Sequence, residues 1–176
     1  KMPLDRLRWA INCLLPEDIK VKRIQFVDLD FNSRFCAKSK VYRYTILNRK
    51  YSSPLSAGRV YFFHYPLDVR LMRSEAKVLL GRHNFAVFQA AELRQRNPIR
   101  RIKRIKITKE KDFLYIDIEA DSFLYNMVRN IVGTLMEIGR GRFPKGSMRK
   151  ILASRKRSCA GPTLPAKGLC LVKVKY

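Results

Sequence analysis

The most unusual side chain of the sequence is Arg129, because it falls inside a strongly apolar stretch with helical spacing. The apolar positions around it share one helix face: Leu124, Met127, Val128, Ile131, Val132, Leu135 and Ile138. A guanidinium on such a face needs a partner, because an unpaired buried cation is very costly. Gly133, one turn further on, leaves room for another segment to approach. The alternative is an arginine that snorkels at the helix edge, and the spacing does not decide between the two.

Aromatic and basic side chains alternate at Tyr42, Arg43 and Tyr44. Exposed aromatic rings beside arginines can stack on unpaired bases of a nucleic acid. Most aromatic residues of strands nevertheless belong to a core, and that is the simpler interpretation of any single ring here. Spacing alone therefore leaves both a packing role and a base-stacking role open for Tyr42.

Basic side chains are concentrated between positions 94 and 111, with a second cluster at 155–157. The members of the first cluster are Arg94, Arg96, Arg100, Arg101, Lys103, Arg104, Lys106, Lys109 and Lys111. Such side chains suit phosphates, because each contact releases condensed counterions and an arginine matches phosphate oxygens as a fork. A run of charges is often no more than a solvated face. The charge of the whole chain favours phosphate contact.

That charge is the strongest compositional signal. The chain has 38 Lys and Arg against 14 Asp and Glu, a formal net charge of +24. A domain this basic requires a polyanionic partner, which means nucleic acid, a ribosome or anionic lipid. Lipid is the weakest candidate, because the basic residues are spread over strands and loops instead of one amphipathic anchor. No segment is apolar enough to span a bilayer. We therefore expect a nucleic-acid partner and no membrane.

Cysteine and histidine give no sign of a metal centre. The four cysteines (Cys13, Cys36, Cys159 and Cys170) are widely spaced and form no Cys-x-x-Cys pair. The two histidines, His64 and His83, have no partner at ligand spacing. We expect reduced thiols, no metal and no disulfide framework, as in a cytosol-like compartment.

The order of predicted helices and strands indicates an α+β fold, with a mainly antiparallel sheet flanked by helices. Helices are expected at 3–14, 67–80, 123–139 and 145–154. Strands are expected at 19–27, 40–48, 59–64, 102–108, 113–119 and 168–174. The fourth and fifth strands form a hairpin candidate around the turn at 109–112.

Five segments follow one another in an order that resembles the tRNA pseudouridine synthase A family. They are 14–19 (LLPEDI), 31–44 (from FNSRFCA to KVYRY), 81–88 (GRHNF with Phe88), 127–133 (MVRNIVG) and 160–171 (AGP followed by PAKGLCL). The run at 127–133 is the most specific of them. Together they extend over nearly all of the chain.

The resemblance implies a pseudouridine synthase-like fold and the isomerisation of uridine to pseudouridine, usually in the anticodon stem-loop of tRNA. It implies no metal or organic cofactor, and a homodimer in the cytoplasm or an organelle matrix. Carried over residue by residue, Tyr42 lies against the target base, Arg129 pairs with a catalytic aspartate and Leu169 lines the base pocket. Arg43, Arg100, Arg101, Lys103 and Arg104 are the expected contacts to the RNA.

The sequence departs from the family in one important respect. The family's aspartate lies in a glycine-arginine-threonine-aspartate stretch upstream of the segment matching 14–19, and none of the chain's aspartates occurs in that context. We therefore expect residues 1–176 to be the C-terminal part of the catalytic domain and to be inactive alone. The fragment interpretation predicts that Arg129 is partly buried without an acidic partner, and that a sheet edge or apolar patch is exposed. A stand-alone basic RNA-binding module derived from the enzyme is the alternative. Asn84 also replaces the family's usual aspartate, which keeps a short side chain able to cap a turn.

Overall fold

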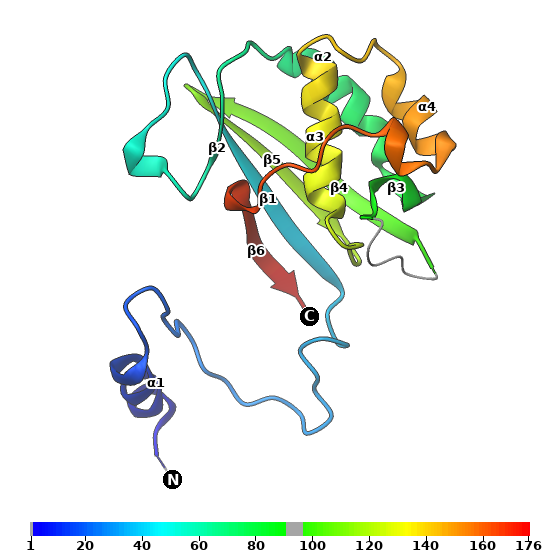
Figure 1. Ribbon diagram of the computed structural model, residues 1–176. Helices are drawn as coiled ribbons and strands as arrows, with labels where there is room; N and C mark the ends of the chain where they lie inside the picture. Colours follow the sequence, from blue (N-terminus) through cyan, green and yellow to red (C-terminus); the bar gives the residue numbers. More distant parts are fainter. Residues whose placement is uncertain (1, 91–96) are drawn as a thin grey trace. The chain divides into compact units, whose positions relative to one another are not determined.

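The computed structural model describes residues 2–90 and 97–176, and the chain divides into two units, Lys1–Cys36 and Ala37–Tyr176 (Figure 1). The first unit contains helix α1 (Leu4–Leu14), which begins one residue after the predicted start at Pro3 and has Pro3 as its N-cap. The strand predicted at 19–27 is wrong. The backbone of that stretch pairs with a side chain and not with a strand: Asn12 accepts from Val21 N at 2.8 Å and donates to Val21 O at 2.9 Å.

The second unit is built on a sheet that has six strands within the described residues. Its order is β2-β1-β5-β4-β3, and β6 also pairs with β1. The strands are β1 (Ser39–Asn48), β2 (Tyr61–Phe63), β3 (Gly81–Asn84), β4 (Ile99–Glu110), β5 (Phe113–Ala120) and β6 (Leu169–Lys175). Only the short β1–β2 pairing is parallel. The predicted α+β class with a mainly antiparallel sheet is confirmed, although β3 was not foreseen.

One face of the sheet is covered by helices α2 (Val69–Ala76), α3 (Met127–Gly139) and α4 (Ser147–Ser154) (Figure 1). The strand β5 shows this most clearly, because its alternate residues Leu114, Ile116 and Ile118 are buried in the core. Residues in between, such as Tyr115 and Asp117, lie on the other face and are only half-buried. The sheet therefore has a helix-covered face and an outer face. None of the described helices is long and apolar enough to cross a membrane.

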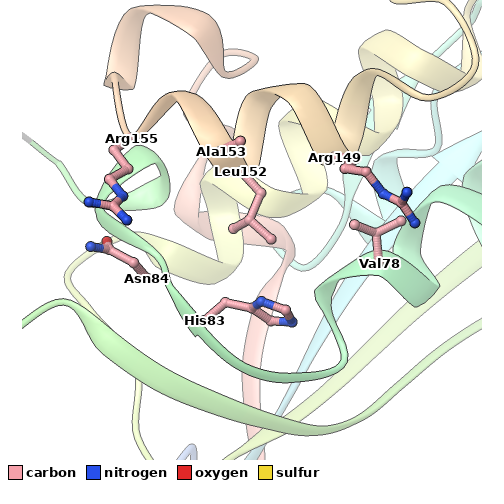
Figure 2. A pocket seen from close by; sticks show the side chains of 7 residues that line it. All are labelled: Val78, His83, Asn84, Arg149, Leu152, Ala153 and Arg155. Carbon is pink, nitrogen blue, oxygen red and sulfur yellow. The ribbon is translucent and has the colours of Figure 1, made fainter.

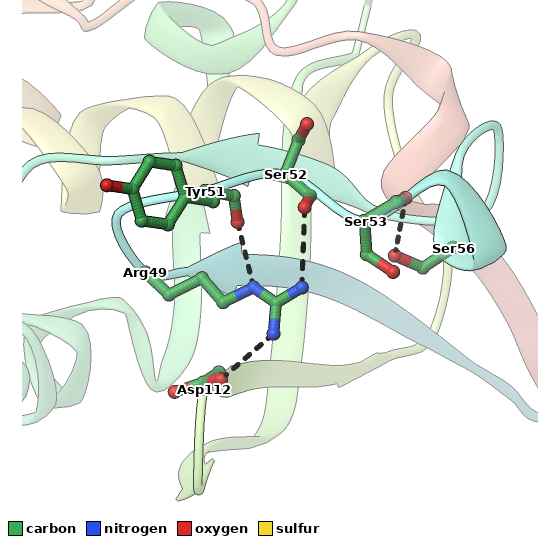
Figure 3. Close-up of polar contacts among 6 residues, drawn as sticks. All are labelled: Arg49, Tyr51, Ser52, Ser53, Ser56 and Asp112. Atoms are coloured by element: carbon green, nitrogen blue, oxygen red, sulfur yellow. Dashed lines mark hydrogen bonds and ion pairs between the residues drawn. The ribbon is translucent and has the colours of Figure 1, made fainter.

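The hairpin of β4 and β5 is confirmed, with Lys111 and Asp112 as its loop. Lys111 has a φ of 53°, the left-handed conformation that tight hairpin turns require. The loop is tied to the end of β1 by Arg49, which donates to Tyr51 O at 2.8 Å and contacts an Asp112 carboxylate oxygen at 3.4 Å (Figure 3). The backbone N–H of Asn48 also donates to Asp112 O at 2.7 Å. These contacts fix where the long strand β1 ends.

Helix α4 is anchored by a buried carboxylate on α2. Glu75 is only 5% exposed, and its two carboxylate oxygens accept from Gly146 N at 2.8 Å and from Met148 N at 3.0 Å. An anion is favourable here, because the first N–H groups of a helix have no partner within the helix. The contact holds the start of α4 against α2.

The apolar spacing predicted that this helix begins at Phe123, but α3 begins at Met127. The reason is Asn126, which has a φ of 59°. A left-handed residue cannot lie inside a right-handed helix, so residues 123–126 lead into α3 as an irregular segment. The consequence is that Arg129 lies in the first turn of α3.

Candidate functional site

Arg129 is half-buried and is held by two neighbouring oxygen atoms. Its Nε donates to the backbone carbonyl of Leu164 at 2.5 Å, and its Nη1 donates to Asn126 Oδ1 at 2.8 Å. No described carboxylate forms an ion pair with it. The second amino group, Nη2, has no hydrogen-bond partner among residues 2–90 and 97–176. This edge of the guanidinium is available to an anion.

The loop that supplies the Leu164 carbonyl lies directly against α3 because two glycines meet there. A Cβ atom at Gly133 would lie 1.9 Å from Pro162 O, and one at Gly161 would lie 2.8 Å from Gly133 C. No side chain fits at either position unless the backbone moves. The prediction that Gly133 admits a close neighbour is confirmed, and the neighbour is the loop at 160–164.

A polar network then fastens this loop to α3. The fully buried Asn130 accepts at Oδ1 from Thr163 Oγ1 at 2.5 Å and from Arg157 Nη2 at 3.1 Å. Arg157 also donates to Gly161 O at 2.9 Å, and burial lowers its pKa from the ordinary value. On the next turn, Thr134 Oγ1 accepts from Gly161 N at 2.9 Å. Buried polar groups that are satisfied in this way rigidify a structure.

The sequence analysis did not single out this network. Its members are ordinary polar residues, and the chain separates Asn130 from Thr163 by 33 positions. The only available signal was the pair of Gly133 and Gly161, since two glycines in an otherwise packed region indicate a close approach of backbones.

Tyr42 lies on β1, on the face that the helices cover, at the edge of the core. Its ring packs edge-to-face on Phe123, with ring centroids 5.1 Å apart and an interplanar angle of 88°. The ring is half-buried, and its hydroxyl group has no hydrogen-bond partner in the described part of the chain. The ring is therefore held in place while its polar end stays available.

Tyr44, two residues further along β1, connects this strand to Pro165, the residue that follows the loop at 160–164. It is fully buried, and its hydroxyl donates to Pro165 O at 2.7 Å. Burial raises the pKa of this hydroxyl; the nearby Tyr61 also raises it, and the positive charge of Arg129 lowers it. Gly168 packs on the ring so closely that a Cβ there would lie 2.8 Å from it.

Leu169, the first residue of β6, directly follows Gly168, which packs on the Tyr44 ring. It pairs with Tyr44 across β1 and β6, and it is half-buried against the core. The pairing shifts by one residue between Val41 and Tyr42, so that Tyr42 faces Leu171. The structure thus brings Tyr42 and Leu169 to the side of the sheet where α3 carries Arg129. An aromatic ring, an aliphatic side chain and a guanidinium edge can together hold a planar base beside an anion.

Arg43 lies elsewhere, because neighbouring residues of a strand point to opposite faces. On the outer face it forms a bidentate ion pair with Asp117, with distances of 2.7 Å and 2.9 Å. Its guanidinium also lies 5.0 Å from the centre of the Tyr115 ring. The hydrogen bonds to Asp117 raise the pKa of Arg43 above its usual value. A groove of about 360 Å³ on this face is lined by Arg43 and by Arg104 of β4.

The other predicted RNA contacts also follow β4. Arg101, Lys103 and Arg104 are exposed, and Lys103 Nζ donates to Lys38 O at 3.0 Å. Arg100 is half-buried and donates from Nη1 to Asn97 O at 2.9 Å and to Ile99 O at 2.6 Å. Two members of the cluster, Arg94 and Arg96, lie outside the described residues.

The strand β6 lies at an edge of the sheet. Within the described chain β6 pairs with β1 alone. Leu171 is 47% exposed and Val172 is 53% exposed. The four cysteines are exposed and unpaired, and no cluster of His, Cys, Asp or Glu among the described residues could hold a metal ion.

The comparisons with known proteins identify the family of the chain. A family model described as tRNA pseudouridine synthase matches residues 76–176, which include Arg129, the loop at 160–164 and β6. The chain is 41% identical to tRNA pseudouridine synthase A of Thermoanaerobacter sp. (strain X514) over 176 residues, 100% of this chain and 72% of the relative. It is 42% identical to tRNA pseudouridine synthase A of Acetivibrio thermocellus over 175 residues, 99% of this chain and 72% of that relative. It is 41% identical to the enzyme of that name from Pectobacterium atrosepticum over 168 residues, 95% of this chain and 59% of the relative. The chain therefore belongs to the tRNA pseudouridine synthase family.

Proposed function

We propose that this protein isomerises uridine to pseudouridine in the anticodon stem-loop of tRNA. Membership of the family supports the reaction and the tRNA substrate. The observation that carries the proposal is Arg129, which is half-buried, fixed by Leu164 and Asn126, and left with one amino group for a further partner. A site prepared for a carboxylate has these properties.

In this reaction the ribose changes its attachment from N1 to C5 of the base, and one proton is lost while another is gained. The bond between N1 of the base and C1′ of the ribose breaks, the base turns, and a bond forms between C5 and C1′. The proton on C5 is lost and N1 gains one, so the product is an isomer of the substrate. No atom is added and no electron is transferred, so we expect the reaction to need no cofactor.

We assign three side chains of this chain to the site. Tyr42 lies against the target base, Leu169 lines the base pocket, and Arg129 pairs with the carboxylate that acts as nucleophile or base. That carboxylate comes from outside the described residues. The target uridine must leave its stack to reach such a site, which costs a few kcal/mol and is least costly in an unpaired loop.

We further propose that the tRNA backbone contacts Arg43, Arg100, Arg101, Lys103 and Arg104. The net charge of +24 supports this role, as does the row of exposed basic residues along β4. In this proposal the ion pair with Asp117 orients the Arg43 guanidinium at the groove that it shares with Arg104.

Three further expectations concern the whole protein. We propose that it acts as a homodimer in the cytoplasm or an organelle matrix. We also propose that residues 1–176 alone bind tRNA without isomerising it, because none of their described carboxylates contacts Arg129. Light scattering of the full-length protein tests the dimer, and a binding assay beside an isomerisation assay tests the inactivity of the isolated chain.

The proposed function is tested with full-length protein and an unmodified tRNA transcript. Carbodiimide treatment followed by primer extension locates each pseudouridine. Modification within the anticodon stem-loop is the expected result. Pseudouridine only outside that stem-loop overturns the proposed substrate region, and the absence of pseudouridine with correctly folded protein overturns the proposed activity.

A further inference from the structure

A basic hollow lies between β3, the 3₁₀ turn at Lys77–Leu79 and α4, and it shares no residue with the site around Arg129. Its volume is about 460 Å³, within the roughly 300–1,000 Å³ typical of ligand sites. The side chains of Val78, Leu152 and Ala153 supply its apolar part (Figure 2). None of the residues that line it is acidic.

Two arginines stand at opposite ends of this hollow, Arg149 beside Val78 and Arg155 beside Asn84 (Figure 2). Both are exposed, and neither has a hydrogen bond or an ion pair with any part of the chain that the structure describes. Arg155 ends α4 with a φ of 55°, so the chain turns there. As far as residues 2–90 and 97–176 are concerned, Arg149 and Arg155 are therefore free to bind anions.

Between the two arginines lies the ring of His83, close to Leu152 (Figure 2). Its Nε2 donates to Leu80 O at 2.8 Å, since a carbonyl oxygen can only accept. The ring also packs edge-to-face on Phe85, with centroids 5.9 Å apart. A ring that is fixed on two sides and bordered by aliphatic carbon offers a surface for stacking.

We infer that this hollow binds one nucleotide of the substrate RNA at a distance from the target uridine. An unpaired base stacks on His83 and contacts Leu152, while the phosphates on either side of it bind Arg149 and Arg155. RNA is the occupant that the observations favour, because they combine unpaired cations, a planar ring and an apolar floor in a chain of net charge +24. An acidic peptide would use the cations but not the ring.

The position of the hollow separates it from the base pocket. Tyr42 lies on β1 and His83 on β3, and two strands, β5 and β4, lie between them. Three strand spacings amount to about 14 Å. The bound nucleotide is therefore a second anchor for the same RNA, and it contributes affinity without taking part in the chemistry. The identity of that RNA as tRNA rests on the proposed function.

The test compares full-length wild type with the double variant R149Q/R155Q. Binding of a tRNA transcript is measured from about 50 to 300 mM salt, and the single-turnover rate is measured at saturating tRNA. We expect affinity to fall about tenfold or more, and the slope of log K against log salt to decrease by about one for each arginine. The single-turnover rate should stay unchanged. The control R59Q/R70Q removes the same charge from exposed positions outside the hollow.

A second variant, H83A, tests the stacking part and leaves Arg149 and Arg155 in place. Loss of one base–ring stack should weaken binding about 5-fold or more with an unchanged salt slope. An R149Q/R155Q protein that binds tRNA like R59Q/R70Q overturns the inference, whatever the isomerisation assay shows. Conversely, a wild type that binds tRNA through this hollow but forms no pseudouridine overturns the proposed function and leaves the RNA anchor in place.

Discussion

Arg129 Nε donates to the carbonyl oxygen of Leu164, so the cation at the start of α3 is held by a loop 35 positions further along the chain. The contact leaves one amino group of the guanidinium without a protein partner in the described chain. Because backbone carbonyls do not neutralise charge, Arg129 keeps its full affinity for an anion while its direction is fixed. Such preorganisation is what electrostatic catalysis requires.

Replacing Gly133 by Ala should disturb this arrangement from a distance. The new methyl group would lie 1.9 Å from Pro162 O, so the loop that carries Leu164 must move. We expect the free energy of unfolding in urea to fall by about 1–3 kcal/mol, as for other overpacked cores, and the single-turnover rate to fall as well. S74A on the exposed side of α2 is the control and should change the free energy of unfolding by less than about 0.5 kcal/mol. Unchanged stability and rate for G133A would contradict the described packing.

The hydroxyl of Tyr42 is tested by Y42F. The variant keeps the edge-to-face contact with Phe123, and the hydroxyl that it removes has no described protein partner. Thermal unfolding should therefore stay close to that of the wild type, whereas the single-turnover rate should fall about tenfold or more. The control Y42L removes the ring and should also lower stability, by about 0.5–1.5 kcal/mol. A wild-type rate for Y42F would show that the hydroxyl does not act on the substrate.

The basic strand β4 is tested by R100Q/R101Q. We expect weaker tRNA binding. The slope of log K against log salt should also decrease in magnitude by about one for each phosphate that the variant no longer binds. Arg100 also donates to Asn97 O and Ile99 O, so each single variant must be compared in thermal unfolding with the wild type. A salt slope equal to that of the wild type would remove these two residues from the RNA-binding face.

Much of this fold follows from local sequence patterns. The alternation on β1, β4 and β5 and the spacing of α1 and α4 were sufficient to predict those elements, and the β4–β5 hairpin was predicted from its turn. The strand predicted at 19–27 fails because a strand needs a partner, which local propensity does not supply. The start of α3 was placed too early because apolar spacing does not reveal that Asn126 is left-handed.

The candidate site was less accessible from sequence. The apolar spacing around Arg129 left a partnered cation and a snorkelling side chain both open, and the structure shows a half-buried guanidinium with two partners. Its partners, Leu164 O and Asn126 Oδ1, could not be predicted, because a backbone carbonyl carries no residue signature. The proposed roles of Tyr42 and Leu169 rest on family resemblance alone, since their spacing is equally typical of a core.

Stability should depend on pH through Glu119 on the outer face. Hydrogen bonds from Lys175 and Ser39 lower the pKa of this carboxyl in the folded protein. A lowered folded pKa contributes stability above the unfolded value of about 4.3, and that contribution is lost as the pH falls through the folded pKa. E119Q should therefore be less stable than the wild type at pH 7, and the difference should shrink below about pH 4. The exposed Glu110 supplies the control E110Q, for which we expect a much smaller difference in urea unfolding at both pH values. A difference for E119Q that is constant from pH 7 to pH 3 would contradict this assignment.

The most direct test of the account is a kinetic comparison of wild type and R129A in the full-length protein. Single-turnover pseudouridine formation and the dissociation constant are measured on the same tRNA transcript. Because Arg129 is expected to hold the catalytic carboxylate, we predict that the rate falls about 10²–10³-fold while the dissociation constant changes less than about fivefold. Equal losses in rate and affinity would make Arg129 a phosphate contact, and an unchanged rate would place the active site elsewhere.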